Sequence, residues 1–488
     1  MKICLINPAP PQSQGLWPPL GIAYIASVLE KNGCQVSIID RSAIKFSSNL
    51  NQEKVDCITR DTLSRLRPEI VGITATTYLI SDAFHTSALI KEILPECIVV
   101  LGGTHASILP EEVLSSTPFI DLISLGEGEL TMLELSERKD YSNIKGIAYR
   151  EGDKFQVNER RNPCLNLDDL GRPARHLLDM KFYLQDSSQI IRGIKLKGTH
   201  VVSSRGCPFK CIFCAGASVF GKKVRFHSVE HVIQEVEELI DEYKVEGIYF
   251  AEDMFLSDKK RAHQICDAFI NRDLNKKIVW CAQLHVNAVD VSLLEKMKSA
   301  GCIQVEYGFE SGSQLTLDRM NKKSTVEKNI EIAQLTKRVG LRVLANIIVG
   351  MPEETEEDFF KTISFMEKIQ AEVVGFNKCV PLPGSQIYAE LKAKGQISNN
   401  LNDYFWMHDN HYMTMDKGKF KKEFRRYKDK LDRRYYWVCF KTNFKRHPEV
   451  VFETTKFYVY HVTILGIKFI LDIFGVRDRV KKILVKKY

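Results

Sequence analysis

Three cysteines lie close together near the middle of the chain, at Cys207, Cys211 and Cys214. Gly206 and Pro208 flank the first of them, which predicts a loop rather than a helix or a strand. Thiolates on a short loop are the protein ligands of iron–sulfur clusters, which normally take four of them. Three thiolates would leave one iron with an open coordination position, as in a catalytic rather than a structural metal site.

Two other interpretations of the triad stay open. Zinc sites prefer paired Cys-x2-Cys motifs or added histidines, whereas three residues separate Cys207 from Cys211 and the nearest downstream histidine is His227. Free cysteines can also pack as small hydrophobic side chains. The spacing Cys-x3-Cys-x-aromatic-Cys, with Phe213 as the aromatic residue, resembles the radical S-adenosylmethionine superfamily. That resemblance implies a [4Fe–4S] cluster whose open iron takes the methionyl amine and carboxylate of S-adenosylmethionine.

Residues 198–390, around the triad, alternate between strand-like and helix-like segments. The predicted strands are His200–Ser203, Gly247–Ala251, Ile278–Ala282, Ile303–Phe309, Arg342–Val349 and Val373–Lys378, and the predicted helices are Ser228–Tyr243, Asp258–Asn271, Val291–Ala300, Thr325–Val339 and Thr355–Ile369. This alternation predicts a partial (β/α)6 barrel. Its functional face should lie at the carboxyl ends of the strands.

Acidic residues follow two of these strands. Glu252 and Asp253 come directly after the second strand, and by resemblance to the superfamily they lie near the methionyl amine. Glu310 comes directly after the fourth strand and is implied to lie near the ribose, with Ser311 beside it as a further cofactor contact. Phe213 is implied to lie near the adenine. Carboxylates suit ammonium and hydroxyl groups, although an acidic pair at a strand end is also typical of the first turn of a helix.

Two more features fall on this face. Gly350-Met351-Pro352 follows the fifth strand and matches a recurring element of the superfamily by position and type. His285 and Asn287 follow the third strand, where relatives often carry an arginine. This difference favours a contact with substrate there instead of with the cofactor carboxylate. The other cysteines of the region form no Cys-x2-Cys pair, so we expect them to pack in the core.

Residues 1–140 show a second alternation of short apolar runs and amphipathic stretches. The predicted strands are Ile3–Asn7, Gln35–Asp40, Ile70–Ala75, Ile98–Gly102 and Leu122–Leu125, and the predicted helices are Leu20–Asn32, Asp82–Leu94 and Glu111–Ser115. Repeated βα units predict a doubly wound parallel sheet, with its ligand site at the carboxyl ends of the strands. Neither a P-loop nor a G-x-G-x-x-G motif follows the first strand, which argues against a nucleoside triphosphate or a dinucleotide.

The loops after these strands resemble the cobalamin-binding domain, of flavodoxin-like fold, that is fused to one large group of radical S-adenosylmethionine enzymes. In that group a hydroxyl-bearing loop and a following Gly-Gly pair embrace the nucleotide tail of the cofactor. Thr74 and Thr76 match the first, and Gly102 and Gly103 match the second. The Gly-Glu-Gly-Glu turn at 126–129 resembles the fifth loop of the same domain. The resemblance therefore implies cobalamin as a cofactor.

One motif of the better-known cobalamin proteins is absent. No Asp-x-His-x-x-Gly, which supplies a lower axial histidine to cobalt, follows the first strand. The resemblance then implies cobalt bound without histidine ligation. His105 is a candidate cofactor contact, although a lone loop histidine more often serves as a hydrogen-bonding residue. The alternative is a domain that now serves only as a scaffold or a substrate lid.

Patterning divides the 488 residues into four parts, and the resemblance names two of them: a cobalamin-binding-like domain at 1–140, a connector at 141–197, a radical S-adenosylmethionine barrel at 198–390 and a mostly helical region at 391–488. Hydrophobic residues make up 44% and charged residues 27%, as in soluble globular proteins. Thirteen cysteines without regular pairing favour a reducing cytosol. The first residues do not resemble a signal peptide. The connector includes a predicted hairpin at Asn143–Asn158.

The basic character of the chain is concentrated at its C-terminal end. Residues 417–488 carry 21 Lys and Arg against 7 Asp and Glu, so residues 1–416 have a net charge of −6 within the total of +8. Basic amphipathic stretches beside interrupted apolar ones favour a peripheral membrane contact or a channel for a lipid-like substrate. A solvated helix face is an equally good interpretation. A nucleic-acid partner is disfavoured because nothing resembles a nucleic-acid module.

These features predict a cytoplasmic enzyme, with association at a membrane surface as an option, that requires an external electron donor. By resemblance, the cluster cleaves S-adenosylmethionine to a 5′-deoxyadenosyl radical, and methylcobalamin delivers a methyl group to an unactivated carbon of a small-molecule or lipid-like substrate. Radical cyclisation or oxidation with the same cofactors is one alternative. A non-catalytic cobalamin-binding regulator is another, which the cysteine triad disfavours. Methylthiolation of transfer RNA is disfavoured because no second cysteine set lies in the N-terminal domain.

Overall fold

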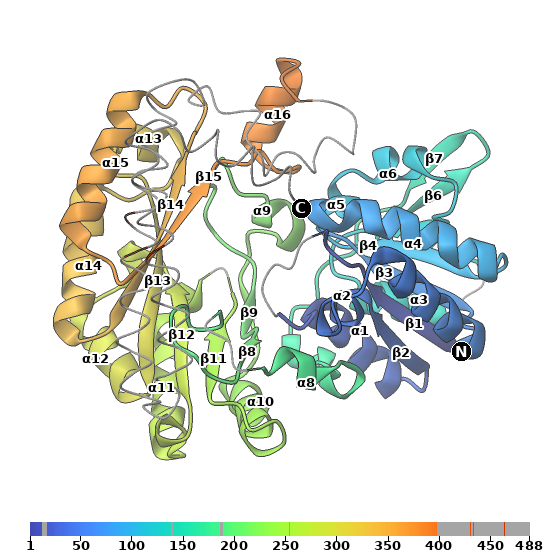
Figure 1. Cartoon of the computed structure of the whole chain (residues 1–488), viewed down its shortest axis with the longest axis horizontal. Helices are drawn as coiled ribbons and strands as arrows, with labels where there is room; N and C mark the ends of the chain where they lie inside the picture. The colour runs from blue at the N-terminus through green and yellow to red at the C-terminus, as the bar shows by residue number, and fades with distance from the viewer. Residues whose placement is uncertain are drawn as a thin grey trace.

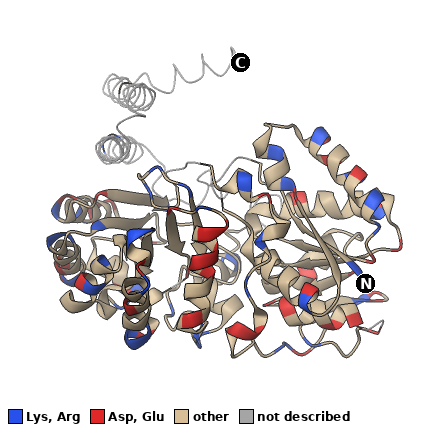
Figure 2. Ribbon diagram, turned by 90° about the horizontal axis from the view of Figure 1, so that it is seen from below, with Lys and Arg blue, Asp and Glu red and all other residues tan. Residues whose placement is uncertain are grey.

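The computed structural model describes residues 1–11, 17–137, 140–185, 189–252 and 254–397, together with residues 430, 433 and 463. Two large β-sheets lie side by side, each covered by helices (Figure 1). Lys, Arg, Asp and Glu lie mainly on the helices and loops around the sheets (Figure 2). Nearly all of the predicted helical region at 391–488, with its basic and apolar stretches, lies outside the described residues.

The first sheet has the strand order β2-β1-β3-β4-β5-β6-β7. Neighbours from β2 to β5 are parallel, whereas β6 and β7 pair antiparallel. The strands are β1 (Lys2–Asn7), β2 (Gln35–Asp40), β3 (Ile70–Thr74), β4 (Ile98–Gly102), β5 (Leu122–Ser124), β6 (Ile147–Glu151) and β7 (Lys154–Val157). The order of the first five is the flavodoxin-like order, which confirms the predicted fold class. The hairpin expected in the connector is β6–β7, and it extends this sheet through β5.

Helices cover both faces of the first sheet. On one face α1 (Leu20–Lys31) and α7 (Glu129–Glu137) share a hydrophobic core with the strands. Ile22, Ala26 and Leu29 recur every three or four residues in α1, so one side of that helix is apolar and buries against the sheet. The opposite face is covered by α3 (Gln52–Leu66), α4 (Ile80–Ile93), α5 (Thr104–Ile108) and α6 (Pro110–Ser116).

The second sheet is an open half-barrel of six parallel strands in the order β8-β11-β12-β13-β14-β15. Its strands are β8 (Gly198–Val201), β11 (Gly247–Phe250), β12 (Val279–Leu284), β13 (Cys302–Glu310), β14 (Arg342–Val349) and β15 (Val373–Lys378). The helices outside it are α10 (Val229–Asp241), α11 (Lys259–Asn271), α12 (Val291–Ser299), α14 (Val326–Val339) and α15 (Glu356–Ile369). These elements confirm the predicted barrel.

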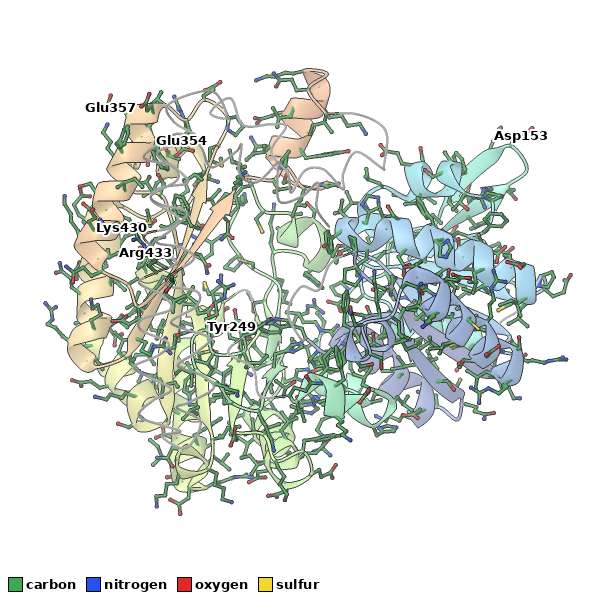
Figure 3. The ribbon with its side chains drawn as sticks, in the orientation of Figure 1. Asp153, Tyr249, Glu354, Glu357, Lys430 and Arg433 are labelled. Atoms are coloured by element: carbon green, nitrogen blue, oxygen red, sulfur yellow. The ribbon has the colours of Figure 1, made fainter. Side chains whose placement is uncertain are left out.

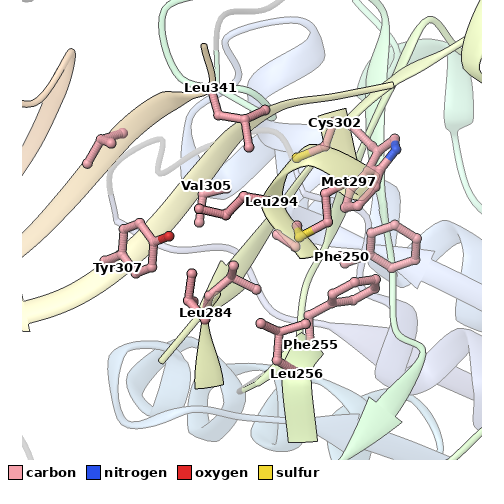
Figure 4. Packing of buried hydrophobic residues seen from close by; sticks show 14 of the residues in the cluster. Phe250, Phe255, Leu256, Leu284, Leu294, Met297, Cys302, Val305, Tyr307 and Leu341 are labelled. Atoms are coloured by element: carbon pink, nitrogen blue, oxygen red, sulfur yellow. The ribbon is translucent and has the colours of Figure 1, made fainter. Parts of the chain in front are cut away.

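The half-barrel separates an apolar outer face from a more polar inner one. Phe250, Leu284, Val305 and Tyr307 alternate with inward residues along their strands and pack against helix residues such as Met297 (Figure 4). Because successive side chains of a strand point to opposite faces, this outer core leaves the intervening residues for the lumen. Among the described helices, none is both long and apolar enough to cross a membrane.

Candidate active site between the two sheets

A short hairpin holds the cysteine loop. β9 (Ser204–Arg205) pairs antiparallel with β10 (Arg225–Phe226), so residues 206–224 form a loop closed at its base. Gly206 has a φ of +100°, and a Cβ there would lie 2.6 Å from the backbone oxygen of Lys223. Only glycine fits at this position without strain. The loop contains α9 (Gly216–Phe220), which lies between the two sheets (Figure 1).

The far side of this loop is fastened to the barrel. The backbone N–H of Ile212 donates to the carbonyl of Met320 at 3.1 Å, and the N–H of Ile387 donates to the carbonyl of Ile212 at 3.1 Å. The Asn321 side chain donates to the Lys210 carbonyl at 2.7 Å. Backbone hydrogen bonds therefore fix the loop at the open end of the barrel, where its thiols can hold a cluster against the strand ends.

The three thiols do not all lie close enough together to share one metal ion. Two sulfurs on one tetrahedral zinc stand about 3.8 Å apart, given Zn–S bonds of about 2.3 Å. Within the described part of the chain, Asp168, His227 and His231 bring three possible metal-ligand atoms within 4.8 Å of one another. The sulfurs of the three cysteines form no such group. In a [4Fe–4S] cluster each thiolate binds a different iron, so its sulfurs stand farther apart.

The thiols are close enough to influence one another and are only partly shielded. Cys207 and Cys211 are half-buried and Cys214 is exposed. The pKa of the Cys211 thiol is raised to about 11, chiefly by burial and in smaller part by Glu310, Cys214 and Cys207, whereas Lys322 opposes the rise. A coordinating metal deprotonates a thiol outright. The donor set therefore fits a cationic cluster that is bound from one side and open on the other.

Lys322 was not singled out from the sequence, yet it lies in the centre of this site. Its ammonium donates to Glu310 Oε1 at 2.9 Å, and both side chains are about nine-tenths buried. Although burial opposes the charged form, Glu310, Cys211 and Cys207 together raise the pKa of Lys322. A permanent positive charge therefore sits beside the thiols. No sequence motif marks it, because its position depends on the turn after α13 (Gln314–Arg319).

The residues after the third barrel strand hold that turn. His285 Nε2 lies 3.3 Å from the carbonyl of Lys322, and the Asn287 side chain donates to the carbonyl of Lys323 at 2.6 Å. The His285 ring also stacks on Phe209 of the cysteine loop, with ring centroids 4.1 Å apart. In this structure His285 and Asn287 position Lys322 and the loop, a role that differs from the substrate contact suggested by their sequence position.

The predicted cofactor residues of the barrel lie at its open end. Glu252 is buried and accepts hydrogen bonds from Ser203 at 2.7 Å and from Ser204. Glu310 has a φ of +62° at a bulge in β13, which turns its carboxylate toward Lys322. Asp253 lies outside the described residues. The contacts of Glu252, Asp253 and Glu310 with S-adenosylmethionine stay predictions.

Two other predicted contacts differ in their surroundings. Phe213 packs against a small hydrophobic cluster of Met320, Met351 and Ile387, so the structure brings it to the same cluster as the Gly-Met-Pro segment. The Ser311 hydroxyl is fully buried and lies 3.0 Å from Thr362 Oγ1. It also accepts the N–H of Ser313 at 3.1 Å. Ser311 therefore braces the strand end against α15, and its contact with a cofactor stays a prediction.

A cavity of about 450 Å³ lies between the first sheet and the barrel. Four residues predicted to hold cobalamin line it: Thr74, Thr76, Gly102 and Gly103. Residues from the barrel side line it as well: His200, Val202, Ser204, Arg205, Gly206 and Glu252. The cavity therefore joins the carboxyl edge of the first sheet to the base of the cysteine loop.

Glycines shape this cavity for a large ligand. A Cβ added to Gly21 or Gly126, both in the wall, would meet no atom within 4 Å, so open space faces them. Gly103 has a φ of +93°, and a Cβ there would lie 2.5 Å from the backbone oxygen of Ala75. Two loops thus approach each other at a point where only glycine fits. A mostly apolar cavity with glycine and hydroxyl edges suits the nucleotide tail and the corrin of cobalamin.

His105 lies close to this cavity but is not part of its wall. It is buried, and its Nδ1 lies 3.1 Å from Thr77 Oγ1. Burial lowers the pKa of His105 to about 4, so its ring is neutral at pH 7. Its contact with cobalamin stays a prediction, and its observed role is to join the loops after β3 and β4.

Comparison with known proteins identifies the family of the chain. The model of the radical SAM superfamily matches residues 201–366, and that of the B12 binding domain matches residues 12–136. An uncharacterized methyltransferase from Pyrococcus horikoshii is 35% identical over 403 residues, which cover 82% of each chain. The anaerobic magnesium-protoporphyrin IX monomethyl ester cyclase of Rubrivivax gelatinosus is 30% identical over 413 residues, covering 81% of this chain and 71% of that protein.

Solved structures share the whole architecture. OxsB, described as a cobalamin-dependent S-adenosylmethionine radical enzyme with aqua-cobalamin and S-adenosylmethionine bound, aligns with a TM-score of 0.72 at 16% sequence identity. The alignment covers 100% of this chain and 74% of that one. At this identity the likeness shows the fold, namely a flavodoxin-like domain set against a half-barrel.

Fold and site together define a radical S-adenosylmethionine enzyme. The chain belongs to the family of radical S-adenosylmethionine enzymes that carry a B12-binding domain. Its cofactors are accordingly a [4Fe–4S] cluster, S-adenosylmethionine and cobalamin, as predicted. The cluster ligands Cys207, Cys211 and Cys214 fit this assignment, and the contacts of individual residues with the two organic cofactors stay predictions.

Proposed function

We propose that this protein methylates an unactivated carbon of a small-molecule substrate. When bound, the cluster supplies the electron that cleaves S-adenosylmethionine, and methylcobalamin supplies the methyl group. The observation that carries the proposal is a cavity whose walls come from both halves, with Thr74, Gly102 and Gly103 on one side and Glu252 and Gly206 on the other. A reaction that uses both cofactors needs their sites to share one enclosed space.

The chain's own residues contribute placement and electrostatics. The three cysteines hold the cluster at the open end of the barrel, and Lys322 keeps a positive charge beside their sulfurs. Ser203 and Ser204 orient the Glu252 carboxylate toward the same space. The mostly apolar cavity wall excludes water, which protects reactive intermediates from side reactions. An electron donor from outside the chain completes the set of partners.

The barrel lumen favours a substrate with polar groups near the reacting carbon. Side chains that share its inner face by strand register include His200, Tyr249, Gln283, Glu306 and Asn346. The Tyr249 hydroxyl (labelled in Figure 3) donates to Gln283 at 3.4 Å. Burial raises the pKa of Glu306, which the nearby Arg192 opposes. Such a lumen provides hydrogen-bond partners, so it suits a polar small molecule better than a bare hydrocarbon chain.

A radical cyclisation or oxidation is the second candidate, and the similarity to the cyclase of Rubrivivax gelatinosus favours it. The two reactions differ in product composition. Methylation adds one CH2 to the substrate, whereas cyclisation or oxidation removes hydrogen atoms. We propose a location in the cytoplasm for either reaction, and an association with a membrane surface would rest on residues outside those described.

The test combines anaerobically reconstituted protein with CD3-labelled S-adenosylmethionine, cobalamin, a chemical reductant and a fractionated cell extract. We expect 5′-deoxyadenosine, and a product that gains a CD3 group in place of a hydrogen. The Cys211→Ala variant is the matched control and should form neither. An unlabelled product that has lost hydrogen would favour the second candidate. Absence of 5′-deoxyadenosine with a fully reconstituted cluster would contradict both.

A further inference from the structure

Four charged side chains connect the first domain to the cysteine loop. Glu127 and Glu129 lie just after β5, Arg205 lies in β9 and Arg225 lies in β10. Arg225 donates to both carboxylate oxygens of Glu127, with one distance of 2.9 Å. Arg205 Nη2 lies 2.7 Å from Glu129 Oε1, and its Nη1 lies 3.5 Å from Glu127 Oε2. Both strands at the base of the cysteine loop are thus paired with one turn of the other domain.

This network is shielded from solvent. The side chains of Arg225, Arg205, Glu129 and Glu127 are 2%, 10%, 5% and 11% exposed. The Arg205 guanidinium also lies over the ring of Tyr24 in α1, 5.0 Å from its centroid. Although burial opposes the charged form, Glu129 and Glu127 hold the pKa of Arg205 above its usual range. Charges in such an environment interact far more strongly than surface pairs do, so the hairpin has one preferred position.

Three of these four charged residues form part of the wall of the cofactor cavity. Glu127, Glu129 and Arg205 all line it, and so does Gly206. Gly206 is the one residue between Arg205 and the first predicted cluster ligand, Cys207. A ligand that contacts this wall therefore contacts residues that are covalently continuous with the cysteine loop.

We propose that Glu127 and Glu129 couple corrinoid binding to the cysteine loop: a corrinoid in the cavity fixes Arg205 and Arg225, and thereby the geometry of the loop that holds the cluster. Coupling between two sites is reciprocal. The cluster should therefore tighten corrinoid binding by the same factor by which the corrinoid tightens the cluster site. This inference rests on the two cofactor sites and is independent of whether methylation follows.

The experiment measures the dissociation constant of aquacobalamin for the protein with and without the reconstituted cluster. The ratio of the two constants is the coupling factor, for which we expect about tenfold, within the 5- to 150-fold range common for coupled sites. The ratio separates coupling from direct contact. A variant that only loses a contact with the corrinoid raises both dissociation constants by the same factor, so the ratio does not change. A ratio of one in the unmodified protein would overturn the proposal, whatever the variants do.

Variants then locate the coupling. Glu127→Gln combined with Glu129→Gln keeps shape and removes both charges, so we expect the ratio to fall to about one. The control is Glu112→Gln, which breaks the ion pair between Glu112 on α6 and Lys392 on α16 (Gln386–Ala393), another link across the two halves that lies outside this cavity. The control should leave the ratio unchanged. If the double variant cannot retain a cluster, the single Glu129→Gln variant should still lower the ratio.

A second readout distinguishes coupling from a purely structural role. In the unmodified protein, added aquacobalamin should shift the midpoint potential of the cluster, measured by redox titration with electron paramagnetic resonance. The double variant should lose this shift, and Arg205→Lys, which retains a positive charge opposite Glu129, should keep part of it. A double variant that retains the full shift and the full binding ratio would contradict the assignment to these carboxylates.

Discussion

Replacing Lys322 with methionine should destabilise the protein strongly, even before any cofactor is bound. The substitution removes a buried ammonium and leaves the Glu310 carboxylate, whose side chain is 8% exposed, without its cation at 2.9 Å. Breaking a buried ion pair by removing one partner costs about 3–5 kcal/mol, because the remaining charge stays desolvated. Glu310 cannot easily turn to solvent, since it ends β13 in a bulge at a φ of +62°.

The measurement is anaerobic urea denaturation of the cluster-free protein. We expect a loss of about 3–5 kcal/mol for Lys322→Met and a clearly smaller loss for Lys322→Met combined with Glu310→Gln, because the double variant buries no unpaired charge. Additive losses from the two single changes, or a loss below about 1 kcal/mol for Lys322→Met, would refute the buried pair. In the reconstituted protein, Lys322→Met should make the reduction potential of the cluster more negative, since it removes a positive charge near the sulfurs.

Three further changes have expected outcomes. Cys211→Ala should abolish formation of 5′-deoxyadenosine, measured by chromatography, while leaving the domain that binds corrinoid folded. Gly103→Ala should weaken aquacobalamin binding at least tenfold, because a Cβ there would lie 2.5 Å from a backbone oxygen, whereas Gly152→Ala at an open turn should not. The free energy of unfolding should fall as the pH drops from about 6.5 toward 4. Burial lowers the pKa of His105 and His285 to about 4 in the folded protein, whereas the pKa of a histidine in the unfolded chain is about 6.5. Acidification through this range therefore favours the unfolded chain, by up to about 3 kcal/mol for each histidine, which urea titrations at several pH values would measure.

The strands of both sheets could be predicted because their sequences are short apolar runs. Arg342–Val349 is a strand over the predicted range, and Gln35–Asp40 is another. Burial on both faces of a parallel sheet leaves such runs little alternative. In contrast, α3 (Gln52–Leu66) was not predicted, because most of its residues are polar. Its buried residues are only Val55, Thr59 and Leu63, which recur every four positions.

The ligand set of the cluster could be predicted because its three residues are neighbours in the chain. Lys322 could not, since it reaches Cys211 only through the turn that His285 and Asn287 hold. Arg225 was missed for the same reason: its partner Glu127 is 98 residues away. Contacts between distant segments require the topology, and a single sequence does not supply it.

The most direct test of the central claim is electron paramagnetic resonance of the anaerobically reconstituted, dithionite-reduced protein with and without S-adenosylmethionine. A [4Fe–4S] cluster predicts about four irons and four sulfides per chain. The open iron position predicts that the spectrum of the reduced cluster changes when S-adenosylmethionine is added. Protein that contains a complete cluster but gives the same spectrum in its presence and absence would contradict the claim that one iron is left for the cofactor.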